Sequence, residues 1–186
     1  PNQRDRVGAS SISANGFATL QVDLFTPAER DDGRVSTSSR ADISLLARRL
    51  AAATRWASKD SRTRYLPRGY FASGTSSAVA MTVSARRSNA ARAIVSMNGS
   101  PHLAQEVLPY VAAPTLLLVG SENEDLVEAN RSGFERIGSA SRLVVLPGAH
   151  HLAERAAAYE RIASLAVEWF ATNFAQTRVR TAGVPR

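Results

Sequence analysis

The sequence predicts an α/β fold, in which a mostly parallel sheet of about five or six strands lies between two layers of helices. The first observation behind this prediction is alternation, because short runs rich in β-branched residues alternate with longer helical patterns. The second is the predominantly apolar character of residues 91–97 and 114–119. Such runs are typical of strands that a parallel sheet buries on both faces. The 186 residues fit one domain large enough to bury its own core.

The individual elements follow from periodicity and from turn residues. In residues 42–58, for example, Ile43, Leu46 and Leu50 recur at the spacing of one helical face. The polar stretch 27–39, which contains Asp31-Asp32-Gly33, predicts a surface loop. The predicted strands are 17–24, 69–71, 91–97, 114–120 and 142–146, and the predicted helices are 42–58, 76–87, 103–110, 125–137 and 155–174. We expect one domain over residues 1–174, followed by a basic, disordered tail over 175–186.

Composition narrows the classes of protein to consider. No run of about 18 apolar residues is present, so we expect no membrane span. The polar N-terminus lacks the apolar stretch of a signal peptide. Cysteine is absent, which rules out disulfides and thiol catalysis and makes the cytoplasm the expected location.

The chain is basic, with a net charge of +7, and all but one of its 23 basic residues are arginine, the exception being Lys59. This arginine bias, together with abundant alanine, is typical of a GC-rich bacterial genome. Because the arginines are scattered along the sequence, we interpret them as a solvated basic surface and do not expect nucleic acid as a partner; the alternative is a polyanion-binding surface.

Polar residues follow three of the predicted strands, at 73–76, 121–125 and 150–151. Chemistry in parallel sheets gathers at the carboxyl ends of the strands, so these groups are the candidate site. The sequence has no glycine-rich dinucleotide or P-loop motif and no His/Cys cluster with metal-ligand spacing. We therefore expect no cofactor and no metal.

Four segments carry a resemblance to a known family: residues 17–27, 69–71, 113–120 and 146–152. Through them the chain resembles the dienelactone-hydrolase-like branch of the α/β-hydrolases, and most of all the short bacterial domains sometimes fused to phosphoribosyltransferases. The resemblance covers about residues 1–174. It implies a small serine hydrolase that acts on ester or lactone substrates, with a serine, an acid and a histidine in that chain order.

Carried over by position, the resemblance places the catalytic histidine on His151, whose alternative is a surface or capping role. The acid position falls on Asn123, which cannot stabilise an imidazolium as a carboxylate does. Glu122, Glu124 and Asp125 are adjacent and would substitute by a shift of one or two residues. Alternatively, they are acidic residues in the first turn of a helix, favourable to its dipole.

The nucleophile position falls on Gly74, so the expected serine is missing from the turn. Ser73 takes that place only if the turn shifts by one residue, which sends a strand side chain to the opposite face. Ser73 and Ser76 are also candidates for a helix N-cap. Two functions stay open: an impaired serine hydrolase that uses Ser73 and His151, and a catalytically inactive binding or assembly module.

The family's first strand and its oxyanion loop are expected to precede Pro1. Without that strand its neighbours have unpaired edges. Two alternatives follow: the pairing segment is missing from this sequence, or the exposed edge of the sheet pairs with a second copy to form a homodimer.

Overall fold

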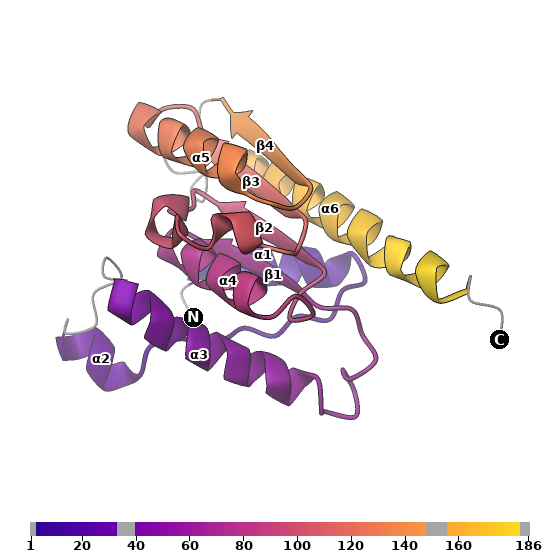
Figure 1. The fold of residues 1–186 in the computed structure, drawn as a ribbon. Coiled ribbons are helices and arrows are strands. Elements are labelled where there is room, and N and C mark those ends of the chain that lie inside the picture. Colours follow the sequence, from indigo (N-terminus) through magenta and orange to yellow (C-terminus); the bar gives the residue numbers. More distant parts are fainter. Residues whose placement is uncertain (1–2, 33–39, 148–155, 183–186) are drawn as a thin grey trace.

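The computed structural model describes residues 3–32, 40–147 and 156–182. Four strands form one parallel sheet in the order β1-β2-β3-β4 (Figure 1). They are β1 (Gly69–Ser73), β2 (Ala93–Met97), β3 (Thr115–Gly120) and β4 (Ser141–Leu146). The α/β fold with a parallel sheet is confirmed, but the sheet has fewer strands than the five or six predicted.

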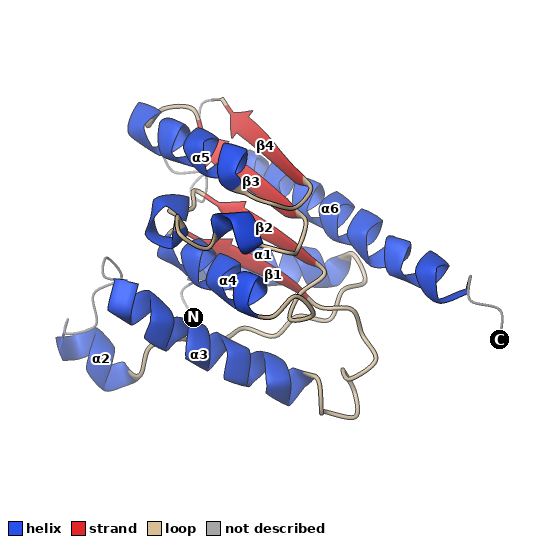
Figure 2. Ribbon diagram, in the orientation of Figure 1, coloured by secondary structure: helices blue, strands red, loops and turns tan. Residues whose placement is uncertain are grey.

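Helices cover both faces of this sheet (Figure 2). On one face lie α3, α4 and α5, and on the other lie α1 and α6. The bounds are α1 (Gln3–Ala14), α2 (Pro27–Asp32), α3 (Arg40–Ala57), α4 (Thr75–Arg86), α5 (Glu124–Arg136) and α6 (Ala156–Ala182). Among the described residues, no helix combines the length and apolarity needed to cross a bilayer.

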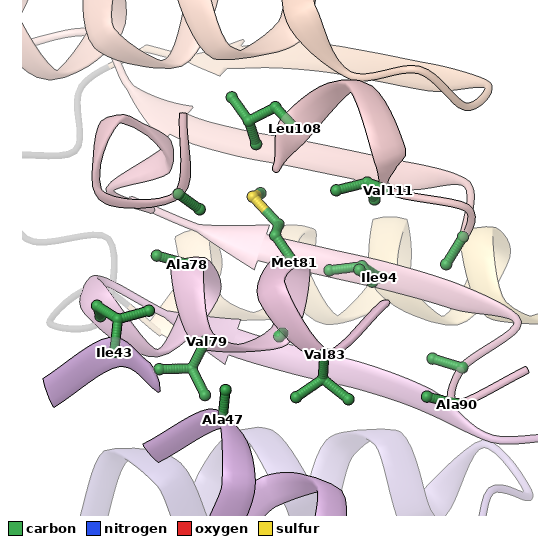
Figure 3. Close-up of a cluster of buried hydrophobic side chains, with 14 of the residues drawn as sticks. Ile43, Ala47, Ala78, Val79, Met81, Val83, Ala90, Ile94, Leu108 and Val111 are labelled. Carbon is green, nitrogen blue, oxygen red and sulfur yellow. The ribbon is translucent and has the colours of Figure 1, made fainter. Parts of the chain in front are cut away.

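The alternation of side chains along the buried strands divides the core into two clusters. In β3, Leu117 packs into the cluster under α3 and α4, whereas Leu116 and Leu118 pack into the cluster under α6. Each strand residue therefore contributes to one face only, as the two-residue period of a strand requires. Figure 3 shows the first cluster, where the small side chains of α4 let it pack closely between α3 and the sheet.

The prediction of a strand over residues 17–24 is wrong. The segment has no regular secondary structure and is not part of the sheet, and residues 18–23 are exposed. Phe17 packs against the cluster on the α6 face, while Leu24 belongs to the cluster on the α4 face. The segment thus crosses from one face of the sheet to the other around the β1 edge. Strand structure needs a hydrogen-bonded partner, and among the residues that the structure describes β1 pairs only with β2.

The prediction of a loop over 27–39 is wrong in its first part, because Pro27–Asp32 forms α2, while residues 33–39 lie outside the described residues. Thr26 and Glu29 form a capping box: the Glu29 N–H donates to Thr26 Oγ1 at 3.3 Å, and the Thr26 N–H donates to Glu29 Oε2 at 2.8 Å. Pro27 at the first helical position suits this start. The signal was present in the sequence as Thr-Pro-Ala-Glu, and the neighbouring aspartates and glycine obscured it.

Glu29 also joins α2 to α3. The Arg49 guanidinium donates to both carboxylate oxygens of Glu29 at 2.7 Å, and to the Leu24 carbonyl at 2.8 Å. Hydrogen bonds from Arg49 and from Thr26 lower the pKa of Glu29 to about 2. Arg49 thereby fixes both the capped helix and the end of the extended segment.

Stability is therefore expected to depend on Glu29 at acid pH. Because its pKa is lower in the folded than in the unfolded state, its contribution is present above about pH 4.5 and is lost as the pH falls toward 2. Urea unfolding of the wild type and of Glu29→Gln measures this. The difference in midpoint should be present at pH 6 and vanish near pH 2, and a difference that does not change with pH would contradict the assignment.

Two further elements differ from expectation. The helix predicted over 103–110 is two short 3₁₀ helices, Pro101–Ala104 and Leu108–Tyr110, each with a proline in its first turn. Pro109 has no N–H to donate, so it starts a new helical segment more readily than it continues one. The last helix is described to Ala182, beyond its predicted end at 174. The division into a domain and a tail at residue 175 stays a prediction.

Candidate functional site at the carboxyl ends of the strands

Gly74 forms the sharp turn between β1 and α4. Its backbone has φ +52° and ψ −131°, a conformation that residues other than glycine rarely adopt. A Cβ built at this position meets no atom within 4 Å, so the space in front of the turn is open. The backbone therefore has the strained strand-to-helix turn that presents a nucleophile, with glycine at its apex.

Hydrogen bonds from the next strand hold this turn. The Gly74 N–H donates to the Met97 carbonyl at 3.1 Å. The Gly74 carbonyl accepts from the N–H groups of Ser77 and Ser100, both at 3.2 Å. The loop after β2 therefore fixes the conformation of Gly74 from outside the turn.

The same pattern continues across the edge of the sheet. The Asn98 N–H donates to the Leu118 carbonyl at 2.8 Å, and Asn98 Oδ1 accepts from the Gly120 N–H at 3.0 Å. The Ser121 N–H donates to the Leu146 carbonyl at 3.0 Å. A continuous row of hydrogen bonds thus joins the carboxyl ends of all four strands.

The role of Asn98 in linking these strand ends was not predicted from the sequence. It has φ +46° without being glycine, a conformation that asparagine tolerates better than most residues. The available signal was the dipeptide Asn98-Gly99 directly after a strand, which marks a turn.

Ser73 is the last residue of β1 and is exposed. Ser76 is exposed in the first turn of α4. The N-cap of that helix is Gly74, with no side-chain cap hydrogen bond, so neither serine has the capping role considered above. Ser73 is therefore an exposed residue beside the turn, and its role as nucleophile stays a prediction.

The acid candidates lie at the start of α5. Asn123 is the N-cap, and its Oδ1 accepts from the Leu126 N–H at 2.9 Å. Glu124 and Asp125 are exposed in the first helical turn, the alternative foreseen from the sequence. A hollow of about 400 Å³ lies beside them, lined by Ser121, Glu124, Asp125, Val127, Glu128 and Val145. His151, the predicted base, lies outside the described residues, as does its neighbour His150.

We expect Asn123→Ala to destabilise the protein by about 1 kcal/mol, because the cap of α5 is lost. Urea unfolding measures the change. The matched variant Asn123→Asp keeps the acceptor and adds a negative charge at the helix N-terminus, so its stability should equal or exceed that of the wild type. Equal losses in both variants would show that capping is not what this side chain contributes.

A buried polar cluster beneath the turn was also missed. It contains Ser77, Ser96 and Asn130, all fully buried. Asn130 Nδ2 donates to the Gly99 carbonyl at 3.0 Å, and Ser77 Oγ donates to the Ala72 carbonyl at 3.2 Å. Gly99 has no room for a side chain, because a Cβ there would overlap Ser96 Oγ. These groups support the turn at Gly74. They were not predicted, because single polar residues within apolar elements form no periodic pattern.

Known proteins share the sequence and the fold of this chain to different degrees. No family model matches the chain. In sequence it is 40% identical over 167 residues to a protein of Mycobacterium tuberculosis called "Putative phosphoribosyl transferase", and the match covers 90% of this chain. The chain spans only 37% of the length of that relative.

Solved structures give the fold directly. A novel cold-adapted esterase from an Arctic intertidal metagenomic library, whose title describes a zinc-bound structure, matches with TM-score 0.66 and 15% identity over 92% of this chain and 78% of that chain. A predicted CIB-like hydrolase from Thermoplasma acidophilum matches with TM-score 0.53 and 13% identity, over 67% of this chain and 59% of that one. At these identities the likeness concerns the fold alone.

A dienelactone hydrolase from Anabaena variabilis is far more similar, with a TM-score of 0.84 and 38% identity over 92% of this chain and 79% of that chain. Both the sequence and the arrangement of the strands and helices therefore match over most of the two proteins. This chain belongs to the dienelactone-hydrolase family of the α/β-hydrolases.

Proposed function

We propose that this chain is a serine-type hydrolase of carboxylic ester or lactone bonds whose catalysis is impaired. The observation that carries the proposal is the turn at Gly74, which keeps the strained conformation of a nucleophile-bearing turn but has no side chain there. The exposed hydroxyl of Ser73 precedes it. The similarity to a dienelactone hydrolase supports a lactone as one class of substrate.

In this proposal Ser73 Oγ attacks the carbonyl carbon while His151 accepts the hydroxyl proton. The alcohol leaves with that proton, and water then hydrolyses the acyl-serine. A carboxylate from the start of α5, with Asp125 as the first candidate, orients the histidine. Catalysis is weak because the hydroxyl lies one residue before the apex and because the Asn123 oxygen already caps a helix.

Hydrolysis of short-chain p-nitrophenyl esters and of a small lactone tests the proposal. We expect slow turnover that disappears in both Ser73→Ala and His151→Ala, with Ser76→Ala as the matched control that retains it. Turnover that survives both substitutions would contradict the assignment, as would the absence of any turnover above the uncatalysed rate.

The second candidate is an inactive binding or assembly module, and one observation favours it. Residues 18–23 are exposed and lie beside the sheet without forming one of its strands, and Leu20 and Val22 have exposed fractions of 55% and 39%. A hollow of about 650 Å³ lies beside this segment, lined by Ala9, Ser10, Ser13, Ala14, Thr19 and Gln21. Such an edge accepts a strand from another chain, and a second copy is the partner predicted above.

Light scattering at several protein concentrations distinguishes this candidate. A dimer that dissociates in Leu20→Lys/Val22→Lys, together with no labelling of any serine by a fluorophosphonate, would favour the assembly module. A monomer at all concentrations would exclude the homodimer.

A further inference from the structure

Residues 55–92 concentrate the charge of the protein. They contain eight arginine or lysine residues and one aspartate, which is a net charge of +7 and equals that of the whole chain. The rest of the sequence is electrically balanced. In the sequence these cations are separated by β1 and by α4, so they look scattered.

The fold brings these cations together near the amino ends of β1 and β2. Helix α3 ends at Ala57 and leads through the loop 58–68 into β1, while α4 ends at Arg86 shortly before β2 begins at Ala93. Since the two strands are parallel and adjacent, their amino ends lie together. Figure 1 shows the ends of α3 and α4 and the loop 58–68 on the same side of the molecule. We call this surface the basic face. It lies at the amino ends of the strands, whereas Gly74 lies at the carboxyl end of β1.

Most of these cations are accessible. Those that are exposed are Arg55, Lys59, Arg62, Arg64, Arg86, Arg87 and Arg92. Within the described parts of the chain, only Arg62 of this set forms an ion pair, with Asp60 at 3.0 Å. Arg55 and Arg86 lie in the last turns of their helices and also offset the helix dipoles. The other exposed cations lie outside the helices.

Two aromatic rings stand among the cations. Trp56 is 53% exposed and Tyr65 is 82% exposed, and the Arg64 guanidinium lies 4.6 Å from the centre of the Tyr65 ring. The loop that carries Tyr65 is held by hydrogen bonds, among them Thr63 Oγ1 to the Ala57 carbonyl at 2.7 Å and the Arg62 N–H to Asp60 Oδ1 at 2.9 Å. The rings are thus presented on an ordered scaffold.

We propose that the basic face binds single-stranded nucleic acid. Exposed arginines neutralise phosphates, and exposed tryptophan and tyrosine rings stack on unpaired bases of any sequence. A duplex fits less well, because both helices meet this face with their carboxyl ends and neither presents an N-terminus to a groove. A membrane surface fits less well, because Lys59, Arg62 and Arg64 stand in the sequence between Trp56 and the exposed pair Tyr65 and Leu66. This activity is independent of the proposed hydrolysis at the carboxyl ends of the strands.

Fluorescence anisotropy with a labelled 20-nucleotide oligo(dT) and an oligo(U) of equal length tests the proposal. We expect binding at 50 mM NaCl that weakens about 50-fold at 200 mM, if about four phosphates are contacted. Tyr65→Ala should weaken binding at least fivefold through lost stacking. Lys59→Ala/Arg64→Ala should weaken it at least fivefold and flatten the salt dependence. The matched control Arg48→Ala/Arg161→Ala removes the same charge from exposed positions elsewhere and should change affinity less than twofold.

The contrary outcomes are equally specific. Absence of binding at 50 mM NaCl overturns the proposal, as does equal weakening in the control variant, which would mean that only net charge matters. Binding to phosphatidylserine vesicles without binding to either oligonucleotide would assign the face to a membrane. Circular dichroism confirms that each variant is folded, and unchanged ester turnover in Tyr65→Ala confirms that the two edges act separately.

Discussion

Gly74→Ser is expected to raise ester turnover by about a hundredfold or more over the wild type. The substitution places a hydroxyl at the apex of a turn that already has the required backbone conformation, and no atom lies within 4 Å of the new Cβ. A fluorophosphonate probe should then label position 74. The rise should disappear in Gly74→Ser/His151→Ala, because the hydroxyl needs a base.

Gly74→Ala is the matched control for this gain. Both variants place a side chain at φ +52°, so each should destabilise the protein by about 1–3 kcal/mol in urea unfolding. Only the serine variant carries a hydroxyl and should gain activity. Equal turnover in the two variants would show that the turn is not aligned with any catalytic base.

Gly138→Ala is expected to destabilise the protein by about 3 kcal/mol or more. A Cβ at this position would approach the Pro109 carbonyl oxygen to 2.0 Å, and that atom belongs to the backbone. The segment cannot move aside easily, because Leu108 is buried and its carbonyl accepts from the Gly138 N–H at 3.2 Å. Thermal unfolding should show the midpoint lowered by about 6–12 °C in a chain of this size.

Gly16→Ala separates this steric effect from the general cost of replacing glycine. Gly16 has φ +84°, and a Cβ there meets no atom within 4 Å. Its substitution should cost only the backbone strain, about 1 kcal/mol. If both variants lost the same stability, the clash at Pro109 would not be the cause.

The sequence predicted the parallel sheet because β2 and β3 are buried on both faces and have no polar alternation to obscure them. The prediction failed at residues 17–24. Their residue types are those of a strand, but a strand also needs a hydrogen-bonded partner, which this stretch of sequence does not reveal. It failed again at α2, where the capping box from Thr26 to Glu29 was present and the polar residues after it dominated the interpretation.

The location of the candidate site could be predicted from the sequence, but the contacts of its residues could not. Motif order located Gly74 and Asn123 at strand ends, and both lie there. What the residues touch depends on tertiary structure: Asn123 caps a helix, and Asn98 links two strands through a backbone conformation that composition does not reveal. The arginines are the opposite case, since their scatter along the chain concealed their convergence in space.

The row of hydrogen bonds that fixes Gly74 from the neighbouring strand has an evolutionary consequence. Because the hydrogen bonds from β2 and the loop after it are made by the backbone of Gly74, a side chain at the apex would leave these bonds in place. The glycine codons GGU and GGC differ from the serine codons AGU and AGC by one base. Where such a codon is used, a single base change in the gene would place a hydroxyl at the apex of this turn.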